Sequence, residues 1–292
     1  MSNRIYNPPA PRATRQRPFG LLVVADRSAS TSDDGARRSD GRLPAEEIAD
    51  SINEHIIALG MAAHKEKADG SGFDLRDYYH LGFAGYAVGV ETIVPPLGTD
   101  RLHPISRVYT SERGWREMPR MLLGEPVAGE TARVPYWVDA EARGGSTNAA
   151  AAMEHARDLV SASLSGAQAY TALTVLHLTD GQYNLGGDPS THMQAIRALD
   201  SAATPVVLMN VYVNPQREAE EIAFPAEFTG SAYGRLLFEQ SSVLPAWMRS
   251  ELERELNRPL EPGARAFVMN ASSTAISMAL RCGTPLSINA PG

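Results

Sequence analysis

Short apolar runs alternate along the chain with longer segments in which apolar residues recur every three or four positions. Runs that are short and nearly unbroken are typical of strands buried on both faces of a parallel sheet. Such strands are predicted at residues 19–25, 171–179 and 205–213, with further strands at 79–84, 88–94, 235–238 and 264–269. The periodic segments predict helices at residues 44–67, 148–164, 190–201, 245–257 and 273–281. This alternation predicts an α/β fold: a doubly wound, mostly parallel central sheet flanked by helices.

Two parts of the chain depart from the alternation. Residues 97–143 contain several prolines and mixed charge without a sustained period, so we expect an irregular insertion with short elements there. Residues 1–18 are rich in Pro and Arg and lack the apolar stretch of a signal peptide. We therefore expect a flexible leader, or alternatively a basic arm that touches a partner. The remainder, residues 19–292, is predicted to be a single domain whose C-terminal part extends from about residue 215.

Charge and cysteine content exclude several classes of protein. The chain of 292 residues has 27 Lys and Arg against 34 Asp and Glu, a formal net charge of −7. Binding to nucleic acid or to an anionic membrane needs clustered positive charge, so we expect neither partner. A single cysteine, Cys282, rules out an internal disulfide framework and a cysteine-rich zinc site. It fits a reducing compartment, and we expect a cytoplasmic protein.

Oxygen-bearing side chains follow two of the predicted strands and precede one helix, all at the same edge of the sheet. Asp26, Ser28 and Ser30 come directly after the first strand, Thr147 ends a Gly-Gly-Ser-Thr segment before a helix, and Asp180 follows the strand at 171–179. The carboxyl ends of parallel strands meet at one rim, where open α/β sheets bind their ligands. Carboxylates and hydroxyls suit a hard divalent cation, above all Mg²⁺. Two carboxylates nearly neutralise such an ion, which then remains able to accept a carboxylate from another molecule.

These three motifs resemble the metal-ion-dependent adhesion site (MIDAS) of the von Willebrand factor type A (vWA, integrin I-like) domain. The resemblance covers roughly residues 18–215. It implies that the pair of strands at 79–94 ends in one antiparallel edge strand. It also implies that Asp26, Ser28 and Ser30 are first-loop metal ligands, with Thr147 the second-loop and Asp180 the third-loop ligand.

The resemblance further implies a function. A MIDAS-type domain is a metal-dependent protein-binding module that recognises an acidic residue of a partner protein through its cation, here Mg²⁺ with Mn²⁺ or Ca²⁺ as alternatives. Its similarity to bacterial cytoplasmic vWA proteins implies an adaptor or scaffold in a stress or modification pathway. The partner and the oligomeric state are not implied.

The same residues also fit roles that need no partner-binding metal. Asp, Ser and Gly are common in turns, and Ser30 or Thr147 is a candidate helix cap. A cation-dependent hydrolase could use the same rim, but no His or Glu lies in the three loops, and the nearest candidate base is Glu141. A structural subunit of an assembly, stabilised by the metal, is a third possibility. Without a nucleophile or base motif, we expect no enzyme and no catalytic residue.

The remaining signals are weak. No phosphate-binding glycine loop and no histidine pair with metal spacing occurs in the sequence. His177 lies inside a predicted buried strand, which indicates a core histidine with satisfied hydrogen bonds. The first loop continues with Asp33 and Asp34, which we expect to be solvated and balanced by Arg37, Arg38 and Arg42.

Overall fold

The computed structural model describes residues 11–31, 41–67, 70–122, 125–141, 144–180, 183–214 and 220–285. Within these residues the main sheet has eight strands in the order β11-β12-β10-β9-β1-β4-β5, and β6 also pairs with β4. The parallel strands are β1 (Phe19–Asp26), β4 (Tyr79–Tyr86), β9 (Ala172–Thr179), β10 (Val206–Tyr212) and β12 (Phe267–Met269). The antiparallel strands are β5 (Val90–Thr92), β6 (His103–Pro104) and β11 (Ile222–Ala223). The predicted mostly parallel sheet with an antiparallel edge strand is confirmed, and β6 and β11 extend it.

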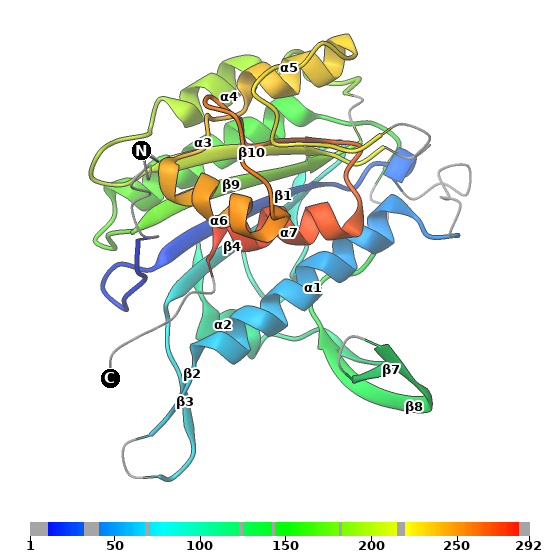
Figure 1. The fold of residues 1–292 in the computed structure, drawn as a ribbon, viewed down its shortest axis with the longest axis vertical. Coiled ribbons are helices and arrows are strands. Elements are labelled where there is room, and N and C mark those ends of the chain that lie inside the picture. Colours follow the sequence, from blue (N-terminus) through cyan, green and yellow to red (C-terminus); the bar gives the residue numbers. More distant parts are fainter. Residues whose placement is uncertain are drawn as a thin grey trace, which may run out of the picture.

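Helices cover both faces of this sheet (Figure 1). One face packs against α3 (Ala149–Ser165), α4 (Ser190–Arg197) and α5 (Ala232–Gln240). The other packs against α1 (Pro44–Ala63), α2 (Ile105–Tyr109), α6 (Ala246–Leu256) and α7 (Ser273–Gly283). The doubly wound arrangement is therefore confirmed. None of the helices in the described part of the chain is both long and apolar enough to cross a lipid bilayer.

Strand β1 shows why its sequence is an unbroken apolar run. All its residues are buried, because β4 and β9 flank it and helices cover it on both sides. Leu21 and Val23 pack with α1 and α7, while Leu22 and Val24 pack with α3. A strand without a solvent-facing side has no place for the polar half of an alternating pattern. The first polar residue, Asp26, therefore marks the point where the strand reaches the rim.

Helix α1 begins as predicted but ends earlier. Pro44 is its first residue, and the backbone N–H of Leu43 donates to the Glu46 carboxylate at 2.8 Å, which fixes the first turn. The prediction that the helix continues to residue 67 is wrong, because residues 64–66 form a strand, β2 (His64–Glu66), paired with β3 (Phe73–Leu75). The segment His-Lys-Glu-Lys has no apolar residue with which to continue the buried stripe of α1.

The insertion at residues 97–143 is more regular than predicted. It contains β6, α2 and a long antiparallel hairpin, β7 (Gly114–Leu122) and β8 (Glu125–Tyr136), which forms a separate two-stranded sheet. Pro119 and Pro135 lie within this hairpin. Proline is tolerated in edge strands that leave one backbone side unpaired, so both strands of a two-stranded ribbon accept it. The prolines that suggested irregular structure are compatible with the hairpin for this reason.

The base of the hairpin is fixed to the helices of the main domain. The Asn53 side chain of α1 accepts hydrogen bonds from the backbone N–H groups of Trp137 (2.8 Å) and Val138 (3.0 Å) and donates to the Val138 carbonyl (2.8 Å). The buried Trp137 indole N–H donates to the Val108 carbonyl at the end of α2 (2.7 Å). Buried hydrogen bonds of this kind hold the segment after β8 in a defined position.

One further prediction is wrong. Residues 235–238, expected to form a strand, lie in α5, whose first turn is capped by Ser231 through a hydrogen bond from the Gly234 N–H (3.1 Å). A short apolar run cannot by itself be assigned to a strand or to a buried helix segment. The other predicted strands and helices are confirmed, although the strands at 88–94 and 264–269 and the helix at 190–201 are shorter than predicted.

Some predictions fall on residues outside the described part. These are the leader at residues 1–10 and the first-loop residues Asp33, Asp34, Arg37 and Arg38. Of the remaining leader, Arg17 donates to the carbonyls of Tyr170 (3.2 Å) and Ala203 (2.8 Å), so this part contacts the amino-terminal edge of the sheet.

Candidate metal site

The three predicted loops meet at the carboxyl edge of the sheet, beside the end of β1. Strand β4 lies on one side of β1 and β9 on the other, and α1 follows β1 while α3 precedes β9. This is the point at which the strand order reverses, where ligands bind in open α/β sheets. Asp26 ends β1, and Asp180 follows β9 directly. The topology thus brings both predicted carboxylates to neighbouring strand ends.

The first loop holds its polar side chains close together. Asp26 is 1% exposed, and its Oδ1 accepts a hydrogen bond from the Ser28 N–H at 2.8 Å. The hydroxyls of Ser28 and Ser30 are 2.9 Å apart, in a short 3-10 turn that the Thr31 hydroxyl closes on the Ser28 carbonyl (2.8 Å). The alternate spacing of Asp26, Ser28 and Ser30 therefore turns all three side chains to one place, as the motif predicts.

The second loop is joined to the first by its backbone. The Ala29 N–H donates to the Gly144 carbonyl at 2.8 Å. Gly144 has a φ of +138°, which residues with a side chain rarely adopt, so glycine is needed at this point of the loop. Thr147 is buried, and its backbone N–H donates to the side-chain oxygen of Asn184 at 2.9 Å.

The alternative role of the two hydroxyl residues as helix caps is wrong. The N-cap of α3 is Asn148, whose side-chain oxygen accepts from the Ala151 N–H at 3.0 Å. The N-cap position of α1 is Leu43. Ser30 and Thr147 therefore lie at the rim without capping either helix.

The third loop supplies the second carboxylate. Asp180 is 2% exposed. Burial, and after it the negative charge of Asp180, raises the pKa of Asp26 from 3.8 to about 7. Like charges that share a buried site disfavour each other's ionised form. Hydrogen bonds from Ser28 and Thr179 lower the same pKa, but they do not offset the burial and the second carboxylate.

The basic residue next to this pair is directed elsewhere. The Arg27 guanidinium donates to the backbone carbonyls of Asp139 (2.9 Å) and Glu141 (2.7 Å) and to the Asp139 carboxylate (2.7 Å). Arg113 forms a second ion pair with Asp139. Arg27 therefore joins the first loop to the segment after β8.

The donor set fits a hard divalent cation. Two carboxylates and three hydroxyls are oxygen ligands, which Mg²⁺, Mn²⁺ and Ca²⁺ accept. A cation between Asp26 and Asp180 would remove the like-charge penalty that raises the Asp26 pKa. Within the described residues no group of three or more His, Cys, Asp or Glu side chains is placed to hold a metal. A metal site in this part of the chain thus depends on hydroxyl ligands as well as carboxylates.

Several residues around the pair were not predicted. The Thr179 hydroxyl faces Asp26 Oδ2 at 3.4 Å, and Tyr86 pairs with Asp26 across the β1–β4 register. Burial, and after it the charge of Asp26, raises the pKa of Tyr86. Asn184 fixes the Thr147 backbone. Only Thr179 has a signal in the sequence, since it directly precedes the third-loop aspartate.

His177 is a core histidine, as predicted. Its Nδ1 lies 2.9 Å from the side-chain oxygen of Asn210, which can only accept, so Nδ1 carries the proton. Its Nε2 then accepts from the Tyr86 hydroxyl at 2.7 Å. Burial lowers the pKa of His177 to about 4, which keeps the ring neutral. This hydrogen-bonded chain fixes Tyr86 beside the candidate site.

Glu141, the nearest candidate base in the sequence, lies in the segment after β8. Its backbone carbonyl binds Arg27, and its carboxylate Oε1 lies 3.7 Å from the Arg113 guanidinium. Its side chain is more than half exposed to solvent.

Comparison with known proteins gives similarity in fold only. No protein-family model and no curated protein matches the chain. Among solved structures, proximal thread matrix protein 1 from the mussel byssus matches with a TM-score of 0.41 and 14% identity, over 95% of this chain and 49% of that one. A form of that protein with a zinc-occupied MIDAS motif matches with a TM-score of 0.39 and 13% identity, over 93% and 48%. The pilus adhesin SpaC from Lactobacillus rhamnosus GG matches with a TM-score of 0.46 and 8% identity, over 94% and 31%. The chain spans about half the length of these structures or less.

Proposed function

We propose that this protein is a metal-dependent protein-binding module of the vWA type. Asp26, Ser28, Ser30, Thr147 and Asp180 would hold one divalent cation, Mg²⁺ in the first instance. The observation that carries the proposal is the pair of buried carboxylates at neighbouring strand ends, which raises the pKa of Asp26 to about 7. Two such groups are costly to keep ionised unless a cation lies between them.

The ligand chemistry supports binding of an acidic group. The cation would supply a Lewis-acidic position at the rim, able to accept a carboxylate oxygen from another protein. The hydroxyls of Ser28, Ser30 and Thr147 add no further negative charge, so the cation would stay electrophilic toward that outside ligand. A partner protein that presents Asp or Glu fits this chemistry, and we propose a role as adaptor or scaffold in a bacterial stress or modification pathway.

A binding function is favoured over hydrolysis by the surroundings of the rim. Glu141, the residue nearest in sequence that could act as a base, has its carboxylate beside Arg113 and largely in solvent. A general base must lie within hydrogen-bond reach of the proton that it removes, and an ion pair with Arg113 does not provide that position. We therefore propose a protein that binds through its metal and does not turn over a substrate.

Calorimetric titration of EDTA-stripped protein with Mg²⁺, Mn²⁺ and Ca²⁺ tests the site. We expect saturable binding at one site in the wild type and none in Asp26→Ala. Asp158→Ala is the matched control, since this exposed aspartate on α3 lies away from the rim and should leave the metal affinity unchanged. Equal metal binding by Asp26→Ala and the wild type, or no binding of any of the three ions by the wild type, would contradict the proposal.

A further inference from the structure

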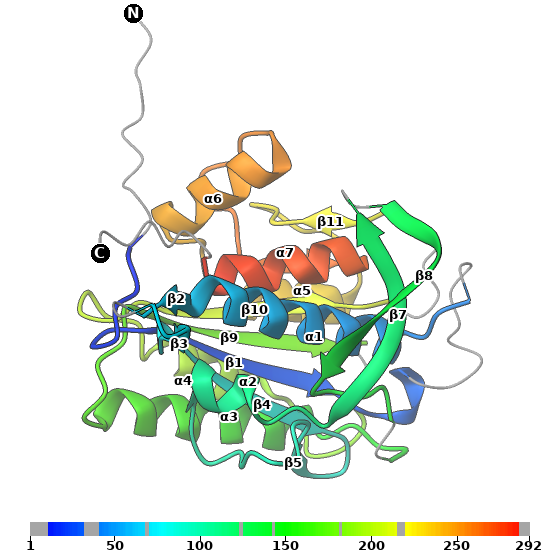
Figure 2. The same ribbon diagram turned by 90° about the horizontal axis from the view of Figure 1, so that it is seen from below.

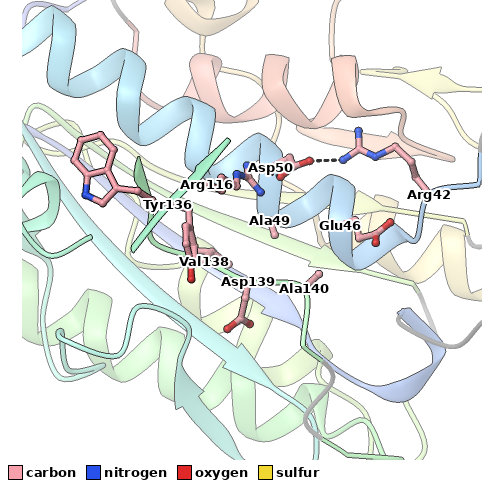
Figure 3. Close-up of a pocket in the computed structure, with 10 residues that line it drawn as sticks. Arg42, Glu46, Ala49, Asp50, Arg116, Tyr136, Val138, Asp139 and Ala140 are labelled. Carbon is pink, nitrogen blue, oxygen red and sulfur yellow. Dashed lines mark hydrogen bonds and ion pairs between the residues drawn. The ribbon is translucent and has the colours of Figure 1, made fainter. Parts of the chain in front are cut away.

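A cleft of about 680 Å³ lies between α1 and the β7–β8 hairpin. Figure 3 shows it bounded on one side by Ala49 and Asp50 of α1, and on the other by Tyr136 and the segment from Val138 to Ala140. Figure 2 shows the hairpin beside the first turns of α1, at the end of the sheet toward which β1 points. The cleft therefore lies at the end of the sheet where β1 ends at Asp26.

The walls of the cleft are held in place before any ligand arrives. Asn53 fixes the backbone of Trp137 and Val138 through three hydrogen bonds, one to Trp137 and two to Val138. Asp50 pairs with Arg42, which precedes α1, and across the cleft with Arg116 of β7 at 2.6 Å. A preformed site loses less conformational entropy when it binds.

The lining favours a polypeptide over a small anion. Its cationic groups, Arg42 and Arg116, share one carboxylate, and Glu46 and Asp139 add two more. There is thus no excess of positive charge in the lining to attract a phosphate. Aliphatic side chains and two aromatic rings line the cleft together with these charges, which suits the mixed side chains and backbone of a protein segment.

An exposed aromatic ring, Trp115, lines the cleft. Trp115 is 53% exposed, and the Arg133 guanidinium lies 5.9 Å from the centre of its ring. Tryptophan and arginine are the residues that contribute most to protein–protein binding when a partner covers them. The near end of the cleft, at Asp139 and Ala140, adjoins the metal loops.

The wall of the cleft formed by residues 139–141 is joined to the metal loops both along the chain and by hydrogen bonds. Arg27, next to Asp26, binds the backbone of Asp139 and Glu141. Only a few residues later, the Gly144 carbonyl accepts from Ala29 in the first loop. A partner segment whose carboxylate lies at the rim would pass over residues 139–141 on its way into the cleft.

We infer that the cleft between α1 and the β7–β8 hairpin binds the polypeptide segment that adjoins the partner's metal-bound acidic residue, with an apolar side chain of that segment against Trp115. This inference rests on the proposed function, because it adds a second contact region to the interface that the metal site would form with the partner. The metal site recognises one carboxylate, while the cleft recognises the sequence around it.

Selection from a displayed library of random linear dodecapeptides tests this inference. The full-length protein is the target, in Mn²⁺, and bound peptides are eluted with EDTA. We expect the selected peptides to combine an Asp or Glu with an aromatic or aliphatic residue at a fixed spacing. Their affinity should fall about tenfold or more in Trp115→Ala and in Ala140→Phe, which fills the near end of the cleft.

The matched control is Phe73→Ala. Phe73 is also an exposed aromatic residue on a hairpin, 69% exposed, but it belongs to β3 at the other end of α1. Phe73→Ala should bind the selected peptides like the wild type. Calorimetry with Mn²⁺ alone should give the same metal affinity for all three variants, which separates loss of the cleft from damage to the metal loops.

Tryptophan fluorescence gives a second readout. Of the three tryptophans, Trp137 and Trp247 are buried, so acrylamide quenches mainly Trp115. A bound peptide should lower the quenching constant of the wild type severalfold.

The outcomes distinguish this inference from the proposed function. EDTA-sensitive peptides that leave Trp115 accessible and bind Trp115→Ala and Ala140→Phe normally would overturn the cleft and uphold the metal site. Metal binding without any EDTA-sensitive peptide would also overturn the cleft. Peptides that stay bound through the EDTA elution, are released only by acid and protect Trp115 would uphold the cleft and contradict the metal-dependent function.

Discussion

Replacing Asp26 by Asn should stabilise the metal-free protein, although it removes a buried hydrogen-bonded group. Burial and the charge of Asp180 raise the pKa of Asp26 from 3.8 to about 7. Because the folded pKa lies above the unfolded one, the contribution of Asp26 to stability is complete below about pH 4 and is lost as the pH rises through about 7. One pKa unit corresponds to about 1.4 kcal/mol, so ionised Asp26 lowers the free energy of unfolding by about 4 kcal/mol above that pH.

Asparagine cannot ionise, so it avoids the cost of a buried charge and loses only one hydrogen bond. It keeps an acceptor for the Ser28 N–H but no longer offers one to the Thr179 hydroxyl, a loss of about 1 kcal/mol. We therefore expect Asp26→Asn to raise the free energy of unfolding by about 3 kcal/mol in EDTA at about pH 8. A carboxylate with a purely structural role would show the opposite sign.

Urea unfolding with and without metal measures the effect. At a free metal concentration about 100 times its dissociation constant, the wild type should gain about 2.7 kcal/mol, and Asp26→Asn should gain nothing. Asp158→Asn, at an exposed position on α3, should behave like the wild type under both conditions. The reasoning is refuted if Asp26→Asn is less stable than the wild type in EDTA and gains as much from the metal.

Three further predictions concern the fold and the loops. Burial lowers the pKa of His55 to about 3. The contribution of neutral His55 to stability is therefore complete above about pH 6.5, and the free energy of unfolding should fall by about 1.4 kcal/mol per pH unit below that. His55→Gln, which can still donate to the Thr284 hydroxyl, should flatten this slope in acid unfolding curves. Asn53→Ala leaves three backbone groups at the base of the hairpin without their hydrogen-bond partner, which should lower the free energy of unfolding in urea by about 3 kcal/mol. A decrease below about 0.5 kcal/mol would show that water replaces the side chain. Gly144→Ala forces a side chain onto a φ of +138°, a strain of about 1 to 3 kcal/mol. Calorimetry should therefore show metal binding about tenfold weaker than in the wild type. An unchanged metal affinity would show that the second loop does not position a ligand.

The sequence predicts the sheet and the rim because both depend on burial along single strands. Strand β1 has no exposed side, so its apolar run and its end at Asp26 are visible without knowledge of its neighbours. The same holds for β9 and Asp180. Since parallel strands end at a common edge, these positions also indicate which loops meet.

The parts that the sequence does not predict depend on contacts between distant segments. The hairpin β7–β8 lies outside the main sheet, so its residues lack the regular alternation that burial on one face would impose. Residues 235–238 form a helix because Ser231 caps it and because α5 covers β10 and β12. Thr179 and Asn184 act on the candidate ligands through hydrogen bonds that only the folded chain brings together.

Arg27 explains how the insertion and the candidate metal site form one surface. Its backbone follows the first candidate ligand, but its side chain binds residues 139 and 141, beyond the hairpin. A basic residue that instead paired with Asp26 would neutralise that carboxylate and weaken its attraction for a cation. Directed toward Asp139, the same positive charge fixes the near wall of the cleft. Because residues 139–141 are bound by the first loop and lead into the second, a shift of the metal loops on binding a partner would move this wall as well.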